Sequence, residues 1–149
     1  MRDPAEGRAT VEGAEQKDRR RSAVVLVVDD DADIRDAVRE VLEEAGYATL
    51  EASHGREALE LLQRAEVKPH LLLLDLMMPT MDGWQLRARL LEDPVLATLP
   101  VVIMTAHAGV LRAVANAQPA TPVLSKPIDV GRLLELVATY CKEEPPGVH

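Results

Sequence analysis

The chain has 149 residues, with 17 Lys and Arg against 25 Asp and Glu, and only three aromatic residues. An acidic chain cannot form the basic stripe that neutralises nucleic-acid phosphates, and three aromatics cannot provide a base-stacking platform, so no nucleic-acid partner is expected. The single cysteine, Cys141, excludes an intramolecular disulfide framework and a thiolate zinc site. The apolar runs are far shorter than the ~18 residues of a membrane span, so we expect a cytoplasmic protein without membrane contact.

The length fits one domain with a polar segment at each end. Residues 1–22 hold six basic and five acidic residues and one β-branched aliphatic, so they are predicted to be a disordered arm. The basic cluster at 17–21 is interpreted as a solvated flank in preference to a docking patch. Residues 142–149, with two prolines, are predicted to be a flexible tail, which leaves 23–141 as the folded domain.

Strand and helix patterns alternate from the start of this domain. Residues 23–28 form a continuous, mostly β-branched apolar run, typical of a strand buried on both faces. Apolar residues then recur at helical spacing from Ile34 to Ala45, and Gly46 is expected to end that helix. A second strand is predicted over 47–51, followed by a helix that starts near 53–55 and carries an apolar stripe to Ala65.

The second half repeats the pattern three times. A buried strand is predicted over 71–75 with a helix over 84–92, a strand over 99–105 with a short helix over 109–117, and a strand over 121–125. The last helix starts after Asp129, a candidate N-cap, and reaches Cys141. Five βα repeats predict an α/β fold, a doubly wound five-stranded parallel sheet with helices on both faces, whose ligands bind beyond the carboxyl ends of the strands.

Polar residues stand at four of those strand ends: Asp29, Asp30, Asp75, Thr105 and Lys126. Clustered carboxylates repel one another unless a cation is supplied, and hard oxygen ligands suit Mg²⁺. A lysine and a hydroxyl complement the oxygens of a phosphoryl group. The pattern therefore predicts a magnesium site with a phosphoryl position beside it.

Each residue also has an ordinary structural interpretation. The acids at 30, 31 and 33 are well placed to charge the first turn of the first helix, and this explanation stays open. Thr105 fits an ordinary strand hydroxyl and Lys126 a solvated surface lysine. For Asp75 the structural alternative is weak, because a carboxylate directly after a buried strand is desolvated without an evident capping role.

The order and spacing of the motifs resemble the receiver domain of bacterial two-component response regulators, such as single-domain chemotaxis and sporulation-relay regulators. Asp30, Asp75, Thr105 and Lys126 are separated by 45, 30 and 21 residues, and the similarity covers about residues 22–141. The resemblance implies a flavodoxin-like (βα)5 fold with strand order 2-1-3-4-5. The matching segments are Val27 to Asp31, Leu74 to Pro79, Met81 to Gly83, Met104 to Ala106, and Ser125 to Pro127.

The resemblance also implies roles for the acidic residues. Asp75 accepts a phosphoryl group from the phosphohistidine of a histidine kinase or a phosphotransfer protein. Asp30, Asp75 and the backbone carbonyl of Met77 bind Mg²⁺ directly, and Asp29 holds it through water. The protein is then no enzyme in the ordinary sense, since it catalyses only its own phosphorylation and a slow dephosphorylation.

The remaining site residues follow from the same resemblance. Lys126 pairs with a phosphoryl oxygen, and Thr105 moves in to bond another, which rearranges the face built from the fourth helix, the fifth strand and the last helix. The peptide between Lys126 and Pro127 is expected to be cis. An unidentified output partner is expected to dock on that face, and the protein is expected to be a monomer or a phosphorylation-dependent dimer.

Several positions depart from the family pattern. Where the family usually has an aromatic switch residue and a Phe, this chain has Val123 and Ile128, and the compact valine cannot act as an aromatic rotamer switch. Met77 cannot orient a water for attack on an aspartyl phosphate, and His107 is interpreted as solvated, so slow self-dephosphorylation is predicted. Trp84 is expected to pack at the start of the third helix.

Three functions fit this pattern unequally. The leading one is a stand-alone phosphoacceptor module without an attached output domain, which signals by docking or by relaying the phosphoryl group. The alternative is a phosphorylation-independent interaction module with a receiver fold, which the altered switch positions favour and the complete acidic site disfavours. A phosphatase of the haloacid-dehalogenase type is excluded, because Met77 stands where that family has its second catalytic Asp.

Overall fold

A computed structural model describes residues 23–64, 68–77, 83–106, 109, 112–113 and 121–141. Its strands form one parallel sheet in the order β2-β1-β3-β4-β5, which confirms the predicted doubly wound fold and its strand order. The predicted arm (1–22), tail (142–149) and most of the predicted helix over 109–117 lie outside the described residues. The elements are β1 (Val24–Val28), α2 (Ala32–Glu44), β2 (Ala48–Ala52), α3 (Gly55–Gln63), β3 (Leu71–Asp75), α4 (Gly83–Glu92), η2 (Leu96–Thr98), β4 (Val101–Thr105), β5 (Val123–Ser125) and α6 (Val130–Cys141).

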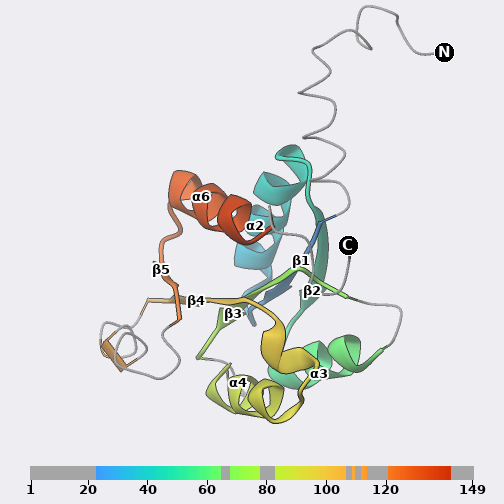
Figure 1. Cartoon of the computed structure of the whole chain (residues 1–149). Coiled ribbons are helices and arrows are strands. Elements are labelled where there is room, and N and C mark those ends of the chain that lie inside the picture. Colours follow the sequence, from blue (N-terminus) through green and yellow to red (C-terminus); the bar gives the residue numbers. More distant parts are fainter. Residues whose placement is uncertain are drawn as a thin grey trace, which may run out of the picture.

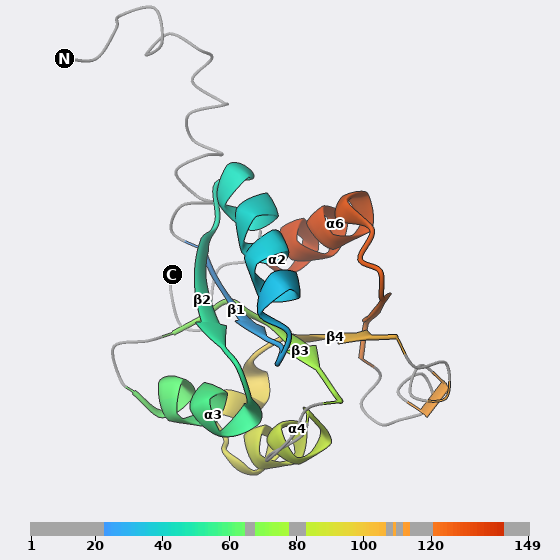
Figure 2. The ribbon, with the colours of Figure 1, turned by 180° about the vertical axis from the view of Figure 1, so that it is seen from behind.

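The sheet is the middle of three layers (Figures 1 and 2). Helices α2 and α6 cover one face, and α3 and α4 cover the other. Successive residues of a strand point to opposite faces, so a strand covered on both sides must be apolar throughout. The central strands meet this requirement with side chains that alternate between the two cores: Val25, Val27, Leu71, Leu73, Val102 and Met104 on the first face, and Leu26, Val28, Leu72, Leu74 and Ile103 on the second.

Both ends of α2 follow from local sequence chemistry. Asp31 caps the start, because its carboxylate accepts hydrogen bonds from the backbone N–H groups of Asp33 (2.9 Å) and Ile34 (3.3 Å). Gly46 ends the helix as predicted, with φ of 99°, a backbone region that favours glycine. The capped start of α2 directly follows the acidic residues after β1, so the cap helps fix the loop that carries them.

Gly83 at the start of α4 touches the backbone that follows β3. A Cβ atom at this position would lie 2.4 Å from Leu76 Cα and 2.6 Å from the Asp75 carbonyl oxygen. The Gly83 N–H donates to the Leu76 carbonyl at 3.0 Å. The helix therefore begins in direct contact with the chain segment that carries Asp75, and only glycine leaves room for that contact.

Several element boundaries differ from the predicted ones by one or two residues. The turn η2 replaces part of the predicted loop, because the Asp93 carboxylate accepts from the backbone N–H groups of Val95 (2.9 Å) and Leu96 (3.4 Å). As a result β4 begins at Val101 and not at residue 99. Strand β5 begins at Val123 and not at 121, and β2 covers 48–52 in place of 47–51.

The C-terminal helix agrees closely with the prediction. The Asp129 carboxylate accepts a hydrogen bond from the Arg132 N–H at 3.0 Å and caps α6. Cys141 is partly buried against the core between α2, α6 and the sheet, and burial raises the pKa of its thiol to about 11. This agrees with the interpretation of Cys141 as a packing residue. Within the described part of the chain, no helix combines the length and apolar character needed to cross a bilayer.

Candidate functional site

Three carboxylates meet at the carboxyl edge of the sheet. Asp29 directly follows β1 and is fully buried, Asp75 ends β3 and is 4% exposed, and Asp30 is exposed. Each offers one oxygen, and these oxygens all lie within 4.8 Å of one another. The cluster forms because β1 and β3 are parallel neighbours, with Val28 opposite Leu74 in register.

Every polar group of Asp29 is engaged. Its N–H donates to the Ala52 carbonyl (3.2 Å), and its carbonyl accepts from Arg35 Nη1 (2.6 Å). Its carboxylate accepts from the Asp31 N–H at 2.9 Å through Oδ1 and from Lys126 Nζ at 2.6 Å through Oδ2. These contacts explain how a buried carboxylate keeps its place, because each lost bond to water is replaced.

Asp75 is held less tightly. Its Oδ1 accepts from the Met77 N–H at 3.0 Å, and its Oδ2 lies 3.3 Å from Lys126 Nζ. Burial raises the pKa of the Asp75 carboxyl to about 6, and the nearby Asp29 charge also raises it, while the Met77 N–H and Lys126 act in the opposite direction. The carboxylate is thus costly to ionise and has capacity for a further cation.

Lys126 closes the site from the end of β5. Its side chain is 15% exposed and lies nearer to Asp29 than to Asp75, at 2.6 Å against 3.3 Å. Burial lowers the pKa of this ammonium, but the hydrogen bond and charge of Asp29, followed by those of Asp75, outweigh burial and raise the pKa overall. The Lys126–Pro127 peptide is cis, as the resemblance implies.

Thr105 connects the ends of the last two strands. It is 1% exposed, pairs with Ser125 across the β4–β5 ladder, and accepts a hydrogen bond from the Lys126 N–H at 2.9 Å through its carbonyl. The structure thus brings the predicted Thr105 and Lys126 to the same edge as the acidic cluster.

The donor set fits Mg²⁺. Hard oxygen atoms are the ligands this ion prefers, and the cluster supplies them from three carboxylates within one small space. Lys126 compensates only part of their charge, so a divalent cation would complete the balance. Asp29, Asp30 and Asp75 would hold the ion, with the backbone carbonyl of Met77 as the further ligand that the family resemblance implies.

The remaining residues singled out in the sequence do not belong to the carboxylate cluster. Met77 is 51% exposed, two residues after Asp75. Trp84 packs, partly buried, against the core on the α3 and α4 side of the sheet, as expected. Val123 packs, partly buried, against the core on the α3 and α4 side, and Ile128 against the core on the α2 and α6 side. His107 lies outside the described residues.

Two histidines without a predicted role have structural ones. His54 caps α3, because its Nδ1 accepts from the Glu57 N–H at 3.1 Å. His70 Nδ1 accepts from the Val24 N–H at 3.1 Å, and burial lowers the pKa of the His70 imidazole. The cap made by His54 agrees with the helix start that the sequence predicts near 53–55. The contact of His70 with Val24 joins residues 46 positions apart, and no sequence pattern indicated it.

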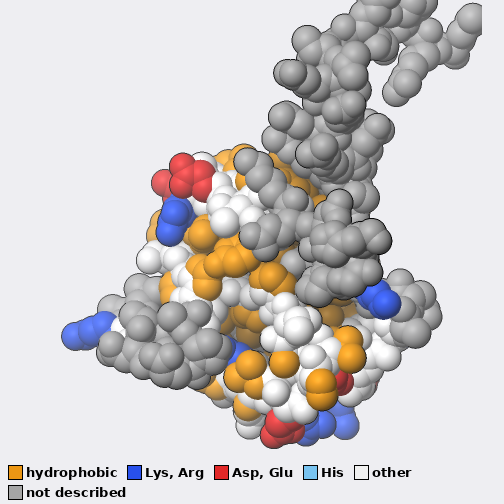
Figure 3. Space-filling view, in the orientation of Figure 1, with side chains coloured by type: hydrophobic (Ala, Val, Ile, Leu, Met, Phe, Trp, Pro, Cys, Tyr) orange, Lys and Arg blue, Asp and Glu red, His pale blue; other side chains and the backbone are white. Residues whose placement is uncertain are grey.

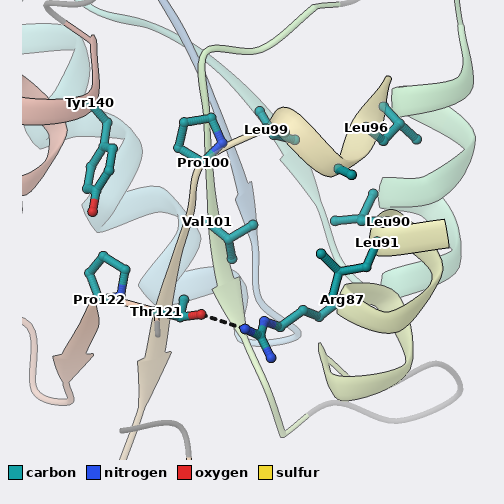
Figure 4. Close-up of a pocket in the computed structure, with 11 residues that line it drawn as sticks. Arg87, Leu90, Leu91, Leu96, Leu99, Pro100, Val101, Thr121, Pro122 and Tyr140 are labelled. Atoms are coloured by element: carbon teal, nitrogen blue, oxygen red, sulfur yellow. Dashed lines mark hydrogen bonds between the residues drawn. The ribbon is translucent and has the colours of Figure 1, made fainter. Parts of the chain in front are cut away.

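A hollow of about 180 Å³ lies away from the acidic cluster, where β4 and β5 begin, at the opposite edge of the sheet. In the view of Figure 3, hydrophobic side chains gather in the middle of the molecule, and most of the visible charged side chains lie toward its outline. Arg87 Nη2 donates to Thr121 Oγ1 at 2.8 Å across the hollow (Figure 4). None of the described residues that line it carries a carboxylate, so these residues lack the chemistry of the carboxyl edge. The walls include Leu90, Leu91, Leu99, Pro122 and Tyr140.

The chain is similar to known signalling proteins. Residues 25–138 match the response regulator receiver domain. The chain is 42% identical over 123 residues to an uncharacterized 14.6 kDa protein of Leptolyngbya boryana, across 82% of this chain and 92% of that protein. It is 40% identical over 115 residues to the DNA-binding transcriptional regulator NtrC of Escherichia coli K12, across 76% of this chain but only 24% of NtrC.

Solved structures show the same similarity. The signal receiver domain of a signal transduction histidine kinase from Syntrophus aciditrophicus matches with a TM-score of 0.73 and 28% identity, over 86% of this chain and 98% of that one. The chemotaxis response regulator CheY4 of Vibrio cholerae matches with a TM-score of 0.70 and 29% identity, over 79% of this chain and 98% of that one.

Proposed function

Because the chain belongs to the family of response regulator receiver domains, we propose that Asp75 accepts a phosphoryl group from the phosphohistidine of a sensor histidine kinase or a phosphotransfer protein, with Mg²⁺ as cofactor. The observation that carries the proposal is the position of Asp75, a buried carboxylate that lies between other carboxylates and the Lys126 ammonium at the carboxyl edge of the sheet. The sequence of NtrC and the fold of CheY4 support the same assignment.

The chemistry requires a nucleophile and charge compensation. A carboxylate oxygen of Asp75 attacks phosphorus, the P–N bond to the donor imidazole breaks, and the imidazole nitrogen keeps the electron pair and takes a proton from solvent. Bound Mg²⁺ supplies positive charge to the phosphoryl oxygens. Lys126 supplies a second positive charge from the β5 side, and the Thr105 hydroxyl donates to a phosphoryl oxygen.

The proposal gives the protein no external substrate to turn over. Its own Asp75 is modified, and the aspartyl phosphate decays or is passed to a further phosphotransfer protein. We place this reaction in the cytoplasm, where ATP charges histidine kinases. The near-complete coverage of the small Leptolyngbya boryana protein, 92% of its length, supports a module that acts without an attached output domain.

Intact mass measurement tests the phosphorylation. The wild type, incubated with phosphoramidate and Mg²⁺, should gain the mass of one phosphoryl group, and chelation of Mg²⁺ should abolish the gain. Asp75→Asn should gain nothing, whereas Asp36→Asn, which removes an exposed carboxylate of α2, should react like the wild type. A folded wild type that gains no mass would refute the proposal.

A phosphorylation-independent interaction module is the second candidate, and Val123 is the observation that favours it. Valine has a small side chain with restricted χ1, so it cannot report phosphorylation by moving a ring between two positions. Hydrogen exchange along β5 and α6 separates the two candidates. Exchange that is identical with and without the phosphoryl group would support the second candidate, and slower exchange in the phosphorylated protein would support the first.

A further inference from the structure

We propose that Arg35 is a positioning residue for the metal site, which fixes the Asp29–Asp30 peptide and thereby aims the Asp30 carboxylate at the cation. The inference rests on the proposed function, because it concerns the same Mg²⁺ site. It assigns a role to a residue outside the group of carboxylates that would bind the metal.

The contact that carries the inference is a short hydrogen bond. Arg35 lies in the first turns of α2, and its Nη1 donates to the Asp29 carbonyl at 2.6 Å. That carbonyl belongs to the planar peptide that joins Asp29 to Asp30. Fixing the direction of the carbonyl therefore fixes the plane of the peptide and the position of the Asp30 Cα atom, and so limits the directions in which the Asp30 side chain can leave the backbone.

Asp30 depends on its backbone for direction. Asp29 is held through its N–H, its carbonyl and both carboxylate oxygens. Asp30 is exposed, and its carboxylate has no hydrogen bond or ion pair with the other described residues. An exposed aspartate samples several rotamers, so the peptide before it is the element that restricts where its carboxylate can point.

The Arg35 side chain is itself held in place. Its Nε lies 3.6 Å from Glu51 Oε1, and Arg39 Nη1 donates to Glu51 Oε2 at 3.3 Å. Glu51 sits on β2 opposite Val27, so the anchor is part of the sheet. The Arg35 side chain is only 17% exposed, and the planar fork of a guanidinium loses little freedom when two of its edges are engaged.

The direction in which Mg²⁺ affinity changes when Arg35 is removed distinguishes a positioning role from a purely electrostatic one. Arg35 carries a positive charge close to the acidic cluster, and a nearby positive charge by itself repels a metal cation. If charge were its only influence, removing Arg35 would tighten Mg²⁺ binding. If Arg35 aims Asp30, removing it weakens binding, because a ligand that must be oriented on binding costs affinity.

The test compares two arginines of the same helix. Arg35→Met keeps the aliphatic packing and removes the donor, and Arg39→Met removes the other arginine that holds Glu51 without touching Asp29. Calorimetric titration of the apo proteins with Mg²⁺ should show about tenfold weaker binding for Arg35→Met and a less than about twofold change for Arg39→Met. Arg35→Lys, which can still donate one hydrogen bond, should lie between Arg35→Met and the wild type.

Each outcome of the titration decides the question. Unchanged or tighter binding in Arg35→Met, or equal losses in both methionine variants, would overturn the inference while leaving the proposed function intact. A wild type that binds no Mg²⁺ would overturn both. Should Arg35→Met fail to fold in thermal melts, Glu51→Gln takes its place, because it leaves Arg35 present but removes its anchor; binding that is not weakened there would also overturn the inference.

Discussion

Replacing Asp75 by Asn should change how the free energy of unfolding of the metal-free protein depends on pH. Burial raises the pKa of Asp75 from 3.8 to about 6 in the folded protein. The folded state therefore holds a proton that the unfolded state has lost between these two values, and ionisation destabilises the fold as the pH rises. An asparagine side chain has nearly the same shape as aspartate and does not titrate. The Asp75→Asn variant therefore does not lose the stability that the wild type loses when Asp75 ionises.

The size of the effect follows from the two pKa values. A shift of one unit corresponds to about 1.36 kcal/mol, so the shift from 3.8 to about 6 is worth about 3 kcal/mol in total. The contribution of Asp75 to stability is complete below pH 3.8 and is lost as the pH rises through about 6. Between about pH 4.5 and about pH 7.5, Asp75→Asn should gain about 2 kcal/mol relative to the wild type.

Urea unfolding of both proteins across this pH range, in the presence of a chelator, measures the gain. Asp36→Asn is the matched control, because its carboxylate is exposed on α2 and 3.7 Å from Arg39, and it should follow the wild-type profile. Mg²⁺ at about pH 7.5 should then stabilise the wild type more than Asp75→Asn, since the ion binds the ionised carboxylate. A difference between Asp75→Asn and wild type that stays constant with pH, or shrinks as pH rises, would refute the reasoning.

Three further substitutions probe the loops around the site. Gly83→Ala should lower the free energy of unfolding by about 2 kcal/mol or more in urea, because the new Cβ would lie 2.4 Å from Leu76 Cα; Gly109→Ala, whose Cβ meets no atom within 4 Å, is the control, and equal losses would contradict the contact. Met77→Asn should shorten the lifetime of the phosphorylated protein, followed by intact mass after the phosphodonor is removed, since an amide can orient a water and the exposed thioether cannot; an unchanged lifetime would count against this. Asp30→Asn should weaken Mg²⁺ binding in calorimetry and raise the melting temperature of the apo protein by relieving carboxylate repulsion, and an unchanged Mg²⁺ affinity would argue against the proposed ligand set.

The fold was predictable because its strongest signals are local. The runs at 24–28 and 71–74 are apolar at every position, as a strand covered on both faces requires, and the structure buries residues 25–28 and 71–74 in the two cores. The predicted end of α2 at Gly46 and the predicted cap of α6 at Asp129 also hold, since each acts on its own backbone neighbourhood, whereas the cap that Asp31 places on α2 was not predicted. The strand errors include the starts of β4 and β5, where the ladder of hydrogen bonds decides and the apolar pattern does not.

The sequence was enough to predict which residues of the site lie together. It was not enough to predict the hydrogen bonds that hold them there. Parallel strands place their carboxyl ends at one edge, so the positions of Asp29, Asp75 and Lys126 follow from topology. The bond from Arg35 to the Asp29 carbonyl ends on a backbone atom, which no side-chain pattern reveals. The closer approach of Lys126 to Asp29 than to Asp75 likewise depends on distances that only the folded chain defines.

Val123 limits how the proposed phosphorylation could change the structure around β5. The residue is partly buried against the core on the α3 and α4 side, and a valine cannot exchange a ring between an inner and an outer position. Among the described residues, one backbone link between the site and β5 is the hydrogen bond from the Lys126 N–H to the Thr105 carbonyl, at 2.9 Å. If Thr105 moves toward a phosphoryl group, as we propose, this bond would pull on the first residue after β5. We therefore expect the Lys126 amide to change its hydrogen-exchange rate on phosphorylation, and a Val123→Tyr variant to add a separate response at the start of β5.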